Sequence, residues 1–225
     1  MFKVAIDGPG GAGKSSISKL AAKKLGFVYI DTGAMYRTAA LYCLRSGIDI
    51  KKEREKAEKA VSEISMDIML SDEGQRIFLN GEDVTDKIRT PEVSMGASDV
   101  SAIPFVREKL VDMQRKLAES KNVIMDGRDI GTCVLPDAEV KIFLTASSEV
   151  RAKRRFDELL EKGEIVTFED VLNDIIVRDR NDETRAVSPL KKADDAVVLD
   201  TSNLSFEESQ KAVIKIIEDK MKEGF

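Results

Sequence analysis

The chain of 225 residues contains no histidine and no tryptophan. Without histidine there can be no Ser-His-Asp or Cys-His catalytic group, no histidine-ligated zinc site and no imidazole base near neutral pH. Any catalysis must therefore rely on Lys, Arg, Asp, Glu, Ser, Thr, Tyr, backbone amides or a bound metal ion.

Cysteine and long apolar runs are also scarce. Cys43 and Cys133 are too far apart for a CxxC pair and each has apolar neighbours, so we expect two reduced, buried thiols. The apolar start of the chain leads into glycines rather than a cleavage site. No window approaches the roughly 20 apolar residues that cross a membrane. We therefore expect a cytoplasmic protein that has no membrane partner.

The charge balance is mildly acidic, with 36 Lys+Arg against 41 Asp+Glu and a formal net charge of −5. This balance disfavours a general nucleic-acid binder unless the cations are concentrated in one place. Hydrophobic residues make up 42% and charged residues 34%, which is typical of a globular chain. The length favours one compact unit with a small insertion over two independent domains. We expect a monomer.

Five short apolar runs are typical of buried strands. They comprise residues 2–6, 27–30, 123–125, 140–144 and 197–199. Each run is continuous rather than alternating, which predicts strands covered on both faces, as in a parallel sheet. Because helical patterns lie between most of these runs, the sequence predicts an α/β fold with a five-stranded parallel sheet flanked by helices.

Local signals mark where several helices begin and end. Gly26 is a suitable stop for a helix with apolar residues at Ile17, Leu20 and Leu25. Pro91 and Pro104 are suited to the starts of two further helices. At the C-terminal end, Ser205 and Glu208 form a capping-box pattern.

Two stretches break the alternation of strands and helices. Residues 77–84, with Asn80-Gly81 at the centre, predict a β-hairpin with a type I′ turn inside a small insertion. Residues 148–182 are highly charged, with a break at Gly163 and a plausible N-cap at Thr167. Such an arm is either a solvated surface or a mobile lid, and the pattern alone favours the surface.

One motif has a clear chemical meaning. The run Gly8-Pro9-Gly10-Gly11-Ala12-Gly13-Lys14-Ser15 fits G-x-x-x-x-G-K-[ST] between a strand and a helix. In this context the backbone N–H groups surround a phosphate, Lys14 reaches the β- and γ-phosphates, and the Ser15 hydroxyl can bind Mg²⁺. The motif predicts a nucleoside triphosphate site. Because the sequence has neither a guanine-reading Asn-Lys-x-Asp nor an ABC signature, a small-molecule kinase is the main remaining class.

Three further segments are rich in arginine and aspartate. They are residues 31–37, 126–131 and 178–185, and the first two follow predicted strands. The carboxyl ends of parallel strands face the ligand crevice of such a sheet. Each Arg–Asp pair alone is usually a surface ion pair, but together beside the glycine-rich loop they predict a basic crevice for more than one phosphate.

These segments, in this order, resemble bacterial cytidylate kinases, which are nucleoside monophosphate kinases. The matching stretches are residues 8–16, 31–37, 81–84, 88–93, 126–132 and 185–190, so the resemblance covers almost the whole chain. The glycine-rich loop is shared by many families, whereas Asp126-Gly127-Arg128-Asp129 is far more discriminating. The resemblance implies a P-loop NTPase fold with a core of about 1–34, 120–150 and 184–225. It further implies a β-containing monophosphate-binding insertion of about 35–119 and a helical lid of about 151–183.

The resemblance also implies a role for particular residues. The nucleotide donor ATP is expected on Gly8, Pro9, Gly10, Gly11, Ala12, Gly13, Lys14, Ser15, Ser16 and Arg154, with Mg²⁺ at Ser15 and Asp126. The acceptor phosphate is expected at Arg37, Arg128 and Arg185 with Thr32 nearby, cytosine at Ser98, Arg107 and Asp129, and ribose at Arg178 and Asp182. Lys14, Arg128 and Arg185 are the expected catalytic residues. For Asp126, capping or orienting the Arg128 loop remains an equal alternative to metal binding.

Two details concern the lid and the glycine-rich loop. The arginines at the start of the lid, Arg151, Arg154 and Arg155, are expected to include contacts to ATP or the moving phosphoryl group. Gly10 stands where relatives often have Ser or Ala, so a hydroxyl contact from that position is not expected.

The implied reaction is ATP + CMP giving ADP + CDP, with dCMP also accepted. The alternatives are a kinase for another monophosphate such as UMP or AMP, a nucleotide-binding protein that has lost catalysis, and a nucleic-acid-binding P-loop ATPase. The last is disfavoured by the net charge of −5.

Overall fold

A computed structural model describes residues 1–71 and 74–223. Within these residues a five-stranded parallel sheet forms the centre, in the order β2-β6-β1-β7-β8. The strands are β1 (Lys3–Asp7), β2 (Val28–Asp31), β6 (Val123–Gly127), β7 (Val140–Thr145) and β8 (Val197–Asp200). All five predicted runs are thus strands of one sheet, and the predicted α/β fold is confirmed.

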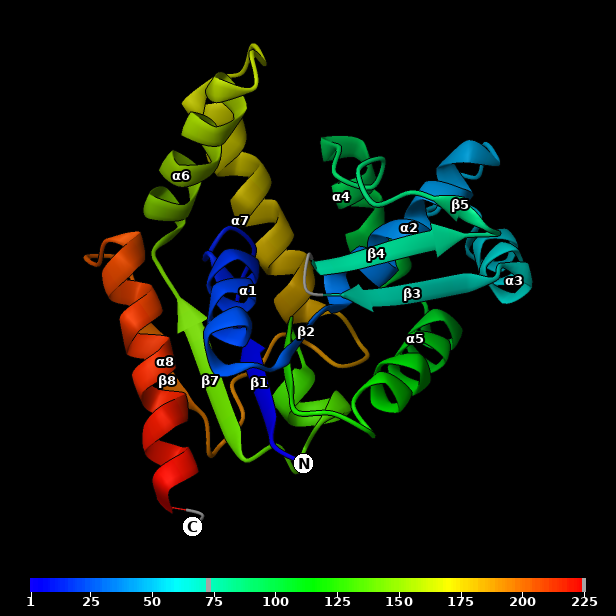
Figure 1. Cartoon of the computed structure of the whole chain (residues 1–225). Helices are drawn as coiled ribbons and strands as arrows, with labels where there is room; N and C mark the ends of the chain where they lie inside the picture. Colours follow the sequence, from blue (N-terminus) through cyan, green and yellow to red (C-terminus); the bar gives the residue numbers. More distant parts are fainter. Residues whose placement is uncertain (72–73, 224–225) are drawn as a thin grey trace.

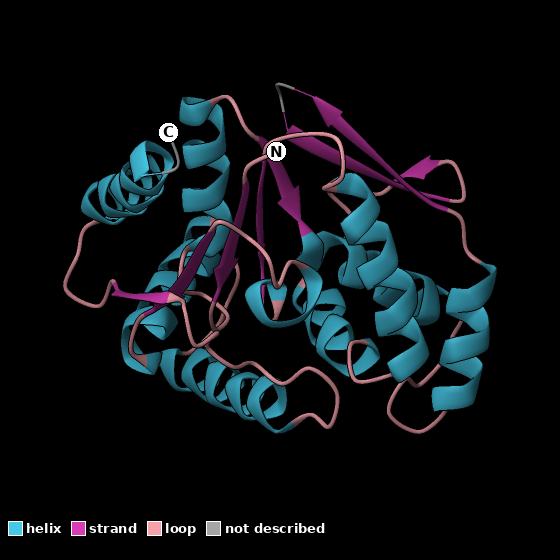
Figure 2. Cartoon of the chain, turned by 90° about the horizontal axis from the view of Figure 1, so that it is seen from below, coloured by secondary structure: helices cyan, strands magenta, loops and turns pink. Residues whose placement is uncertain are grey.

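Helices cover both faces of this sheet (Figure 2). On one face α1 (Lys14–Leu25) and α8 (Phe206–Glu223) pack on β1, β6 and β7 through side chains such as Ile17, Ile142 and Val213. On the other face, α5 (Pro104–Leu117) and a single π-helical turn, η1 (Ile130–Val134), pack on Ile30 and Met125. Burying large apolar side chains contributes about 1.5–3 kcal/mol each, so the two layers hold the strands firmly in place.

The predicted helix boundaries hold at several positions. Helix α1 ends at Gly26, whose φ of 69° is left-handed. Pro91 and Pro104 begin α4 (Pro91–Val100) and α5. Before α8, the Ser205 hydroxyl accepts a hydrogen bond from the Glu208 amide, and the Glu208 carboxylate accepts one from the Ser205 amide.

A smaller unit follows β2 and carries its own hydrophobic cluster. It contains α2 (Thr32–Arg45), α3 (Arg54–Glu63), β3 (Met66–Ser71), β4 (Gly74–Leu79), β5 (Glu82–Asp83) and α4, to the right in Figure 1. The predicted hairpin is confirmed, because Leu79 pairs with Glu82 and both Asn80 and Gly81 have positive φ angles. Strand β3, which the pattern did not predict, pairs antiparallel with β4.

The charged arm is a pair of helices that projects from the sheet (Figure 1). Helix α6 (Ser148–Glu161) ends just before Gly163, and α7 (Phe168–Thr184) begins after Thr167, whose hydroxyl accepts a hydrogen bond from the Asp170 amide. The two helices share a cluster of their own that includes Leu159 and Ile175. The predicted break and N-cap are therefore confirmed.

Two expectations about burial are wrong. Strand β8 is an edge strand and leaves Val197 and Val198 about half exposed, at 47% and 53%, so it is not covered on both faces. Cys43 is buried, but Cys133, in the π-helical turn, is only partly so; within the described residues both are free thiols. No helix in the described parts of the chain is long and apolar enough to cross a membrane.

Candidate active site

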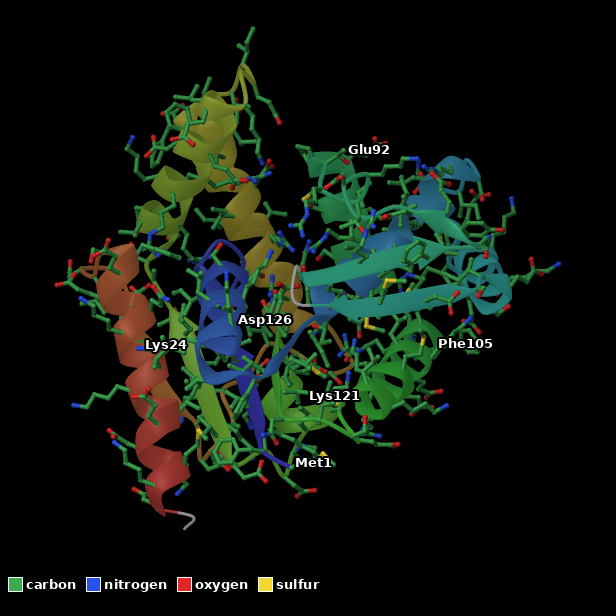
Figure 3. All side chains as sticks on the ribbon, viewed as in Figure 1. Met1, Lys24, Glu92, Phe105, Lys121 and Asp126 are labelled. Carbon is green, nitrogen blue, oxygen red and sulfur yellow. The ribbon has the colours of Figure 1, made fainter. Side chains whose placement is uncertain are left out.

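A cleft of about 910 Å³ lies at the carboxyl ends of the strands. Its walls come from the loop between β1 and α1, the start of α2, helices α4 and α5, the end of β6, and helices α6 and α7. Figure 3 places Asp126, at the end of β6, in the middle of the molecule. The cleft thus joins all the Arg- and Asp-rich segments of the sequence.

The loop between β1 and α1 has the shape of an anion site. A Cβ atom on Gly8 would lie 2.0 Å from the Leu144 carbonyl oxygen, so the close approach of the loop to β7 requires glycine. Gly13, with φ of 87°, precedes α1, and among the described residues no side chain caps this helix. The first amides of α1 therefore remain available to an anion, which the helix N-terminus also attracts electrostatically.

Lys14 is buried at the floor of this loop. Its Nζ donates a hydrogen bond to the Pro9 carbonyl at 2.7 Å. Burial, and then the charge of Arg128, hold the pKa of Lys14 well below its usual value. A phosphate beside this ammonium would oppose both effects, because an adjacent anion favours the charged form of a lysine.

A group of oxygen atoms lies next to Lys14. The Ser15 hydroxyl donates to Asp126 Oδ2 and the Tyr29 hydroxyl donates to Asp126 Oδ1, both at 2.8 Å. The Thr32 hydroxyl donates to the Asp126 backbone carbonyl at 2.7 Å. Burial, and then the charge of Asp31, raise the pKa of Asp126. Hydroxyl and carboxylate oxygens of this kind are ligands that Mg²⁺ accepts.

Another part of the cleft contains a buried set of charges around Asp129. Arg107 forms an ion pair with Asp129, and its guanidinium lies 5.6 Å from the centre of the Tyr36 ring. Arg185 Nη2 lies 3.7 Å from the second carboxylate oxygen of Asp129. The hydroxyl of Tyr36 has no hydrogen-bond partner within the described residues. This wall therefore combines an acceptor, two cations and an aromatic face.

Three more arginines line the same cleft. Arg128 Nε donates to Asp182 Oδ2 at 2.7 Å, and Arg37 Nη2 donates to Asp31 Oδ2 at 2.9 Å. Arg178 lies half-buried beside Arg128, and desolvation followed by that neighbouring charge lowers the pKa of Arg178 to about 10. Such crowding of cations in a buried cleft is unfavourable without an anion, so the arrangement is suited to bind phosphates.

The arginines of the arm have different surroundings. Arg151 is 5% exposed and donates to the Ala146 carbonyl, to the Gly10 carbonyl at 3.0 Å and to both carboxylate oxygens of Asp179. Arg154 lines the cleft and donates to the Thr201 carbonyl at 2.8 Å. Arg155 also lines the cleft and pairs with Glu158. Arg151 therefore braces the glycine-rich loop against α7, whereas the other two remain nearer to an incoming ligand.

The cleft brings together almost all residues singled out from the sequence. Those that line it are Gly10, Gly11, Ala12, Gly13, Lys14, Ser15, Ser16, Thr32, Arg37, Ser98, Arg107, Asp126, Arg128, Asp129, Arg154, Arg178, Asp182 and Arg185. Gly8 and Pro9 are not among them; they form the base of the loop, through the close approach to β7 and the bond to Lys14.

The sequence motifs imply no role for Tyr36 or Asp179, and they leave open which contact Arg151 makes. Asp179 lies inside the Arg-rich run 178–185, but its partner is 28 residues away, and spacing alone could not identify it. Tyr36 lies inside the matching stretch 31–37, which is the only signal that could have pointed to it.

The family model and the curated relatives that match this chain agree on one family. The cytidylate kinase family matches residues 4–219. A cytidylate kinase of Caldicellulosiruptor bescii is 55% identical over 215 residues, covering 96% of this chain and 95% of the relative. A cytidylate kinase of Thermotoga neapolitana is 45% identical over 221 residues, covering 98% and 99%. The crystal structure of an uncharacterized protein from Eubacterium ventriosum covers 97% of this chain and 99% of its own, with a TM-score of 0.54 and 12% identity, which is a likeness of fold.

Proposed function

The chain belongs to the cytidylate kinase family, and from this membership we propose that it transfers the γ-phosphoryl group of ATP to CMP, giving ADP and CDP. We extend the proposal to dCMP. The structural observation that carries it is the position of the Arg107–Asp129 pair in the same cleft as Lys14. The proposed triphosphate site and a set of donors and acceptors able to recognise a nucleobase thus lie in the same cleft.

The polarity of the Asp129 wall suits cytosine. The exocyclic amine of cytosine is a donor, and a carboxylate is its natural acceptor. Uracil has a carbonyl at that position and would face Asp129 with like polarity. Arg107 supplies donors for the remaining acceptors of the ring, and Ser98, half-buried at the edge of the cleft, is a further polar contact in the proposal.

The chemistry requires charge neutralisation rather than a strong base. The acceptor is a phosphate oxygen whose second pKa is about 6, so it is already anionic at neutral pH. Two anionic groups must approach in line, and catalysis depends on positioning and on neighbouring cations. We assign this role to Lys14, Arg128 and Arg185, with Arg37 holding the acceptor phosphate. The absence of histidine is compatible with this mechanism.

Residues of the ATP side fit a magnesium ion. The Ser15 hydroxyl and the Asp126 carboxylate, 2.8 Å apart, would hold it, and Asp31 adds negative charge nearby. At this position Mg²⁺ would supply positive charge against the phosphates of ATP. The bonds of Asp126 to Ser15 and Tyr29, rather than to the Arg128 side chain, support the metal role over that of orienting the Arg128 loop.

We further propose contacts to ATP and ribose, a role for the arm, an oligomeric state and a cellular location. Arg154 contacts ATP, Arg178 and Asp182 hold the ribose, and the α6–α7 arm acts as the lid. We also propose a monomer. A cytoplasmic location is supported by the free thiols of the described chain, since reducing compartments keep cysteines unpaired.

The test is phosphoryl transfer from ATP, in the presence of Mg²⁺, to each of CMP, dCMP, UMP and AMP, measured as ADP release. We expect CMP and dCMP to be the best acceptors. Lys14→Ala should abolish transfer, whereas Lys24→Ala, at an exposed position in the last turn of the same helix, should not. A clear preference for UMP or AMP, or no transfer to any acceptor, would contradict the proposal.

A further inference from the structure

Asp7 is a buried carboxylate that no motif in the sequence names. It is the last residue of β1, directly before the glycine-rich loop, and is 4% exposed. Its Oδ1 accepts a hydrogen bond from the Ile130 amide and its Oδ2 accepts one from the Gly131 amide, both at 2.8 Å. The carboxylate thus joins β1 to a turn that lies 123 and 124 residues further along the chain.

These two amides open the π-helical turn η1, immediately after Arg128 and Asp129. Strands β1 and β6 are neighbours, and Asp7 is in register with Gly127. The pairing of β1 with β6 ends at Gly127. Beyond it, the Asp7 carboxylate accepts hydrogen bonds from the Ile130 and Gly131 amides. It therefore fixes the direction in which the chain turns after β6, and with it the starting points of the Arg128 and Asp129 side chains.

The surroundings of Asp7 act on its charge in opposite directions. Burial, the largest cause, and the charge of Asp129 raise the pKa of Asp7, whereas the two amides and Lys14 lower it, and the pKa that results is about 6. Lys141 also lies close to this turn, against Gly131. A group this buried is ionised at neutral pH only because it accepts two N–H bonds, which an apolar residue at this position could not do.

We infer that Asp7 is a positioning residue for the acceptor side of the reaction: its carboxylate holds the turn that presents Arg128 and Asp129 to the nucleoside monophosphate. The inference rests on the proposed function. Asp7 is not among the described residues that line the cleft, and it acts through the backbone of the turn. The glycine-rich loop that follows Asp7 is held separately, by hydrogen bonds from Arg151 to the Gly10 carbonyl and from Lys14 to the Pro9 carbonyl.

The main test is Asp7→Asn. The side-chain amide of asparagine has one oxygen, which can accept a hydrogen bond from only one of the two backbone N–H groups. Its NH₂ group would face the other N–H, so one hydrogen bond is lost and two donors are brought together. Because hydrogen bonds to a charged acceptor are the strong ones, we expect the KM for CMP to rise about tenfold or more and the preference for CMP over UMP to fall. The KM for ATP should change less than about twofold, because the glycine-rich loop keeps its own supports.

Two further variants separate positioning from loss of stability. Ile217→Ala removes a fully buried side chain from α8, on the opposite face of the sheet, and should lower the melting temperature without changing either KM. Gly131→Ala disturbs the same hydrogen bond through the donor residue rather than the acceptor, since the new Cβ would lie 3.4 Å from Asp7 Oδ2 and 3.1 Å from the Lys141 side chain. It should raise the KM for CMP more than that for ATP, and it carries the test if Asp7→Asn does not fold.

The outcomes are distinguishable. If the unaltered protein does not phosphorylate CMP, the proposed function fails. If the unaltered protein is active but Asp7→Asn and Gly131→Ala change only the melting temperature, or raise both KM values equally, the positioning role of Asp7 is overturned. Calorimetric titration of CMP into each variant, which does not depend on turnover, should show the same loss of affinity.

Discussion

The buried carboxylate of Asp7 should make the folded protein respond to pH in a direction opposite to ordinary acid denaturation. Its pKa is raised from 3.8 to about 6 in the folded chain, mainly by burial. The folded state therefore binds the proton more tightly than the unfolded state. The contribution of this group to stability is fully present below pH 3.8 and is lost as the pH rises through about 6.

The size of the effect follows from the two pKa values. A tenfold change in a protonation equilibrium corresponds to about 1.4 kcal/mol, so the difference between pKa values of 3.8 and about 6 amounts to about 3 kcal/mol. When the pH is lowered from 7.5 to 5, Asp7 should add about 1.4 kcal/mol to the free energy of unfolding. At pH 5 its carboxyl is mostly protonated in the folded protein but mostly ionised in the unfolded protein. Asp7→Asn removes the titrating group, so the difference in unfolding free energy between the two proteins isolates it from every other carboxylate.

Urea denaturation at half-unit steps from pH 5 to pH 7.5 measures this difference. The unaltered protein should gain about 1.4 kcal/mol relative to Asp7→Asn as the pH is lowered across that range. A difference that stays constant would mean that the carboxyl titrates normally. A difference that grows toward pH 7.5 would mean a depressed pKa and would refute the reasoning that burial dominates. Asp129 and Lys14, whose charges also act on Asp7, are present in both proteins.

Three further variants, and a control variant for the last, change side chains in the cleft or next to it. Arg128→Ala should lower kcat by about 10³-fold, the scale expected for an arginine that stabilises transferring phosphate, while the melting temperature falls by only a few degrees; near-normal turnover in the folded variant would exclude this role. Asp129→Ala should lower the ratio of kcat/KM for CMP over UMP by about tenfold, the value of one good base contact, and an unchanged ratio would argue against cytosine recognition at that wall. Arg151→Met removes the hydrogen bond to the Gly10 carbonyl and leaves the Asp179 carboxylate without its ion-pair partner. It should lower the free energy of unfolding, measured by urea denaturation, by about 3–5 kcal/mol and should also lower kcat. Arg155→Met, which removes an i,i+3 pair at the edge of the arm, should cost under about 1 kcal/mol.

The features that local patterns control were predictable from the sequence. The five strands, the Asn80-Gly81 turn and the Thr167 cap each depend on neighbouring residues, and each is found in the structure. The glycine-rich loop was equally clear, because its spacing reflects the contact with one anion. The burial of β8 was not predictable, since a continuous apolar run does not reveal whether a strand lies at the edge of the sheet.

The partners of the charged side chains required the three-dimensional structure. Arg107 and Asp129 are 22 residues apart in the chain, and Arg128 and Asp182 are 54 apart. Nothing in the spacing of these residues distinguishes a buried ion pair from two solvated side chains. Strand β3 was missed for a related reason: it is stabilised by pairing with β4, and its own pattern carries little signal.

The separate hydrophobic cluster of α6 and α7 has a mechanical consequence. Because Leu159 and Ile175 pack within the arm rather than against the sheet, any movement of the arm must displace both helices as one stiff lever. Helix α6 has 14 residues and is therefore about 21 Å long. A rotation of about 20° at its base would carry the far end through about 7 Å, a simple consequence of that length. The base of this lever contains Arg151, which touches the glycine-rich loop, so a small angular change at the loop becomes a large translation at the tip.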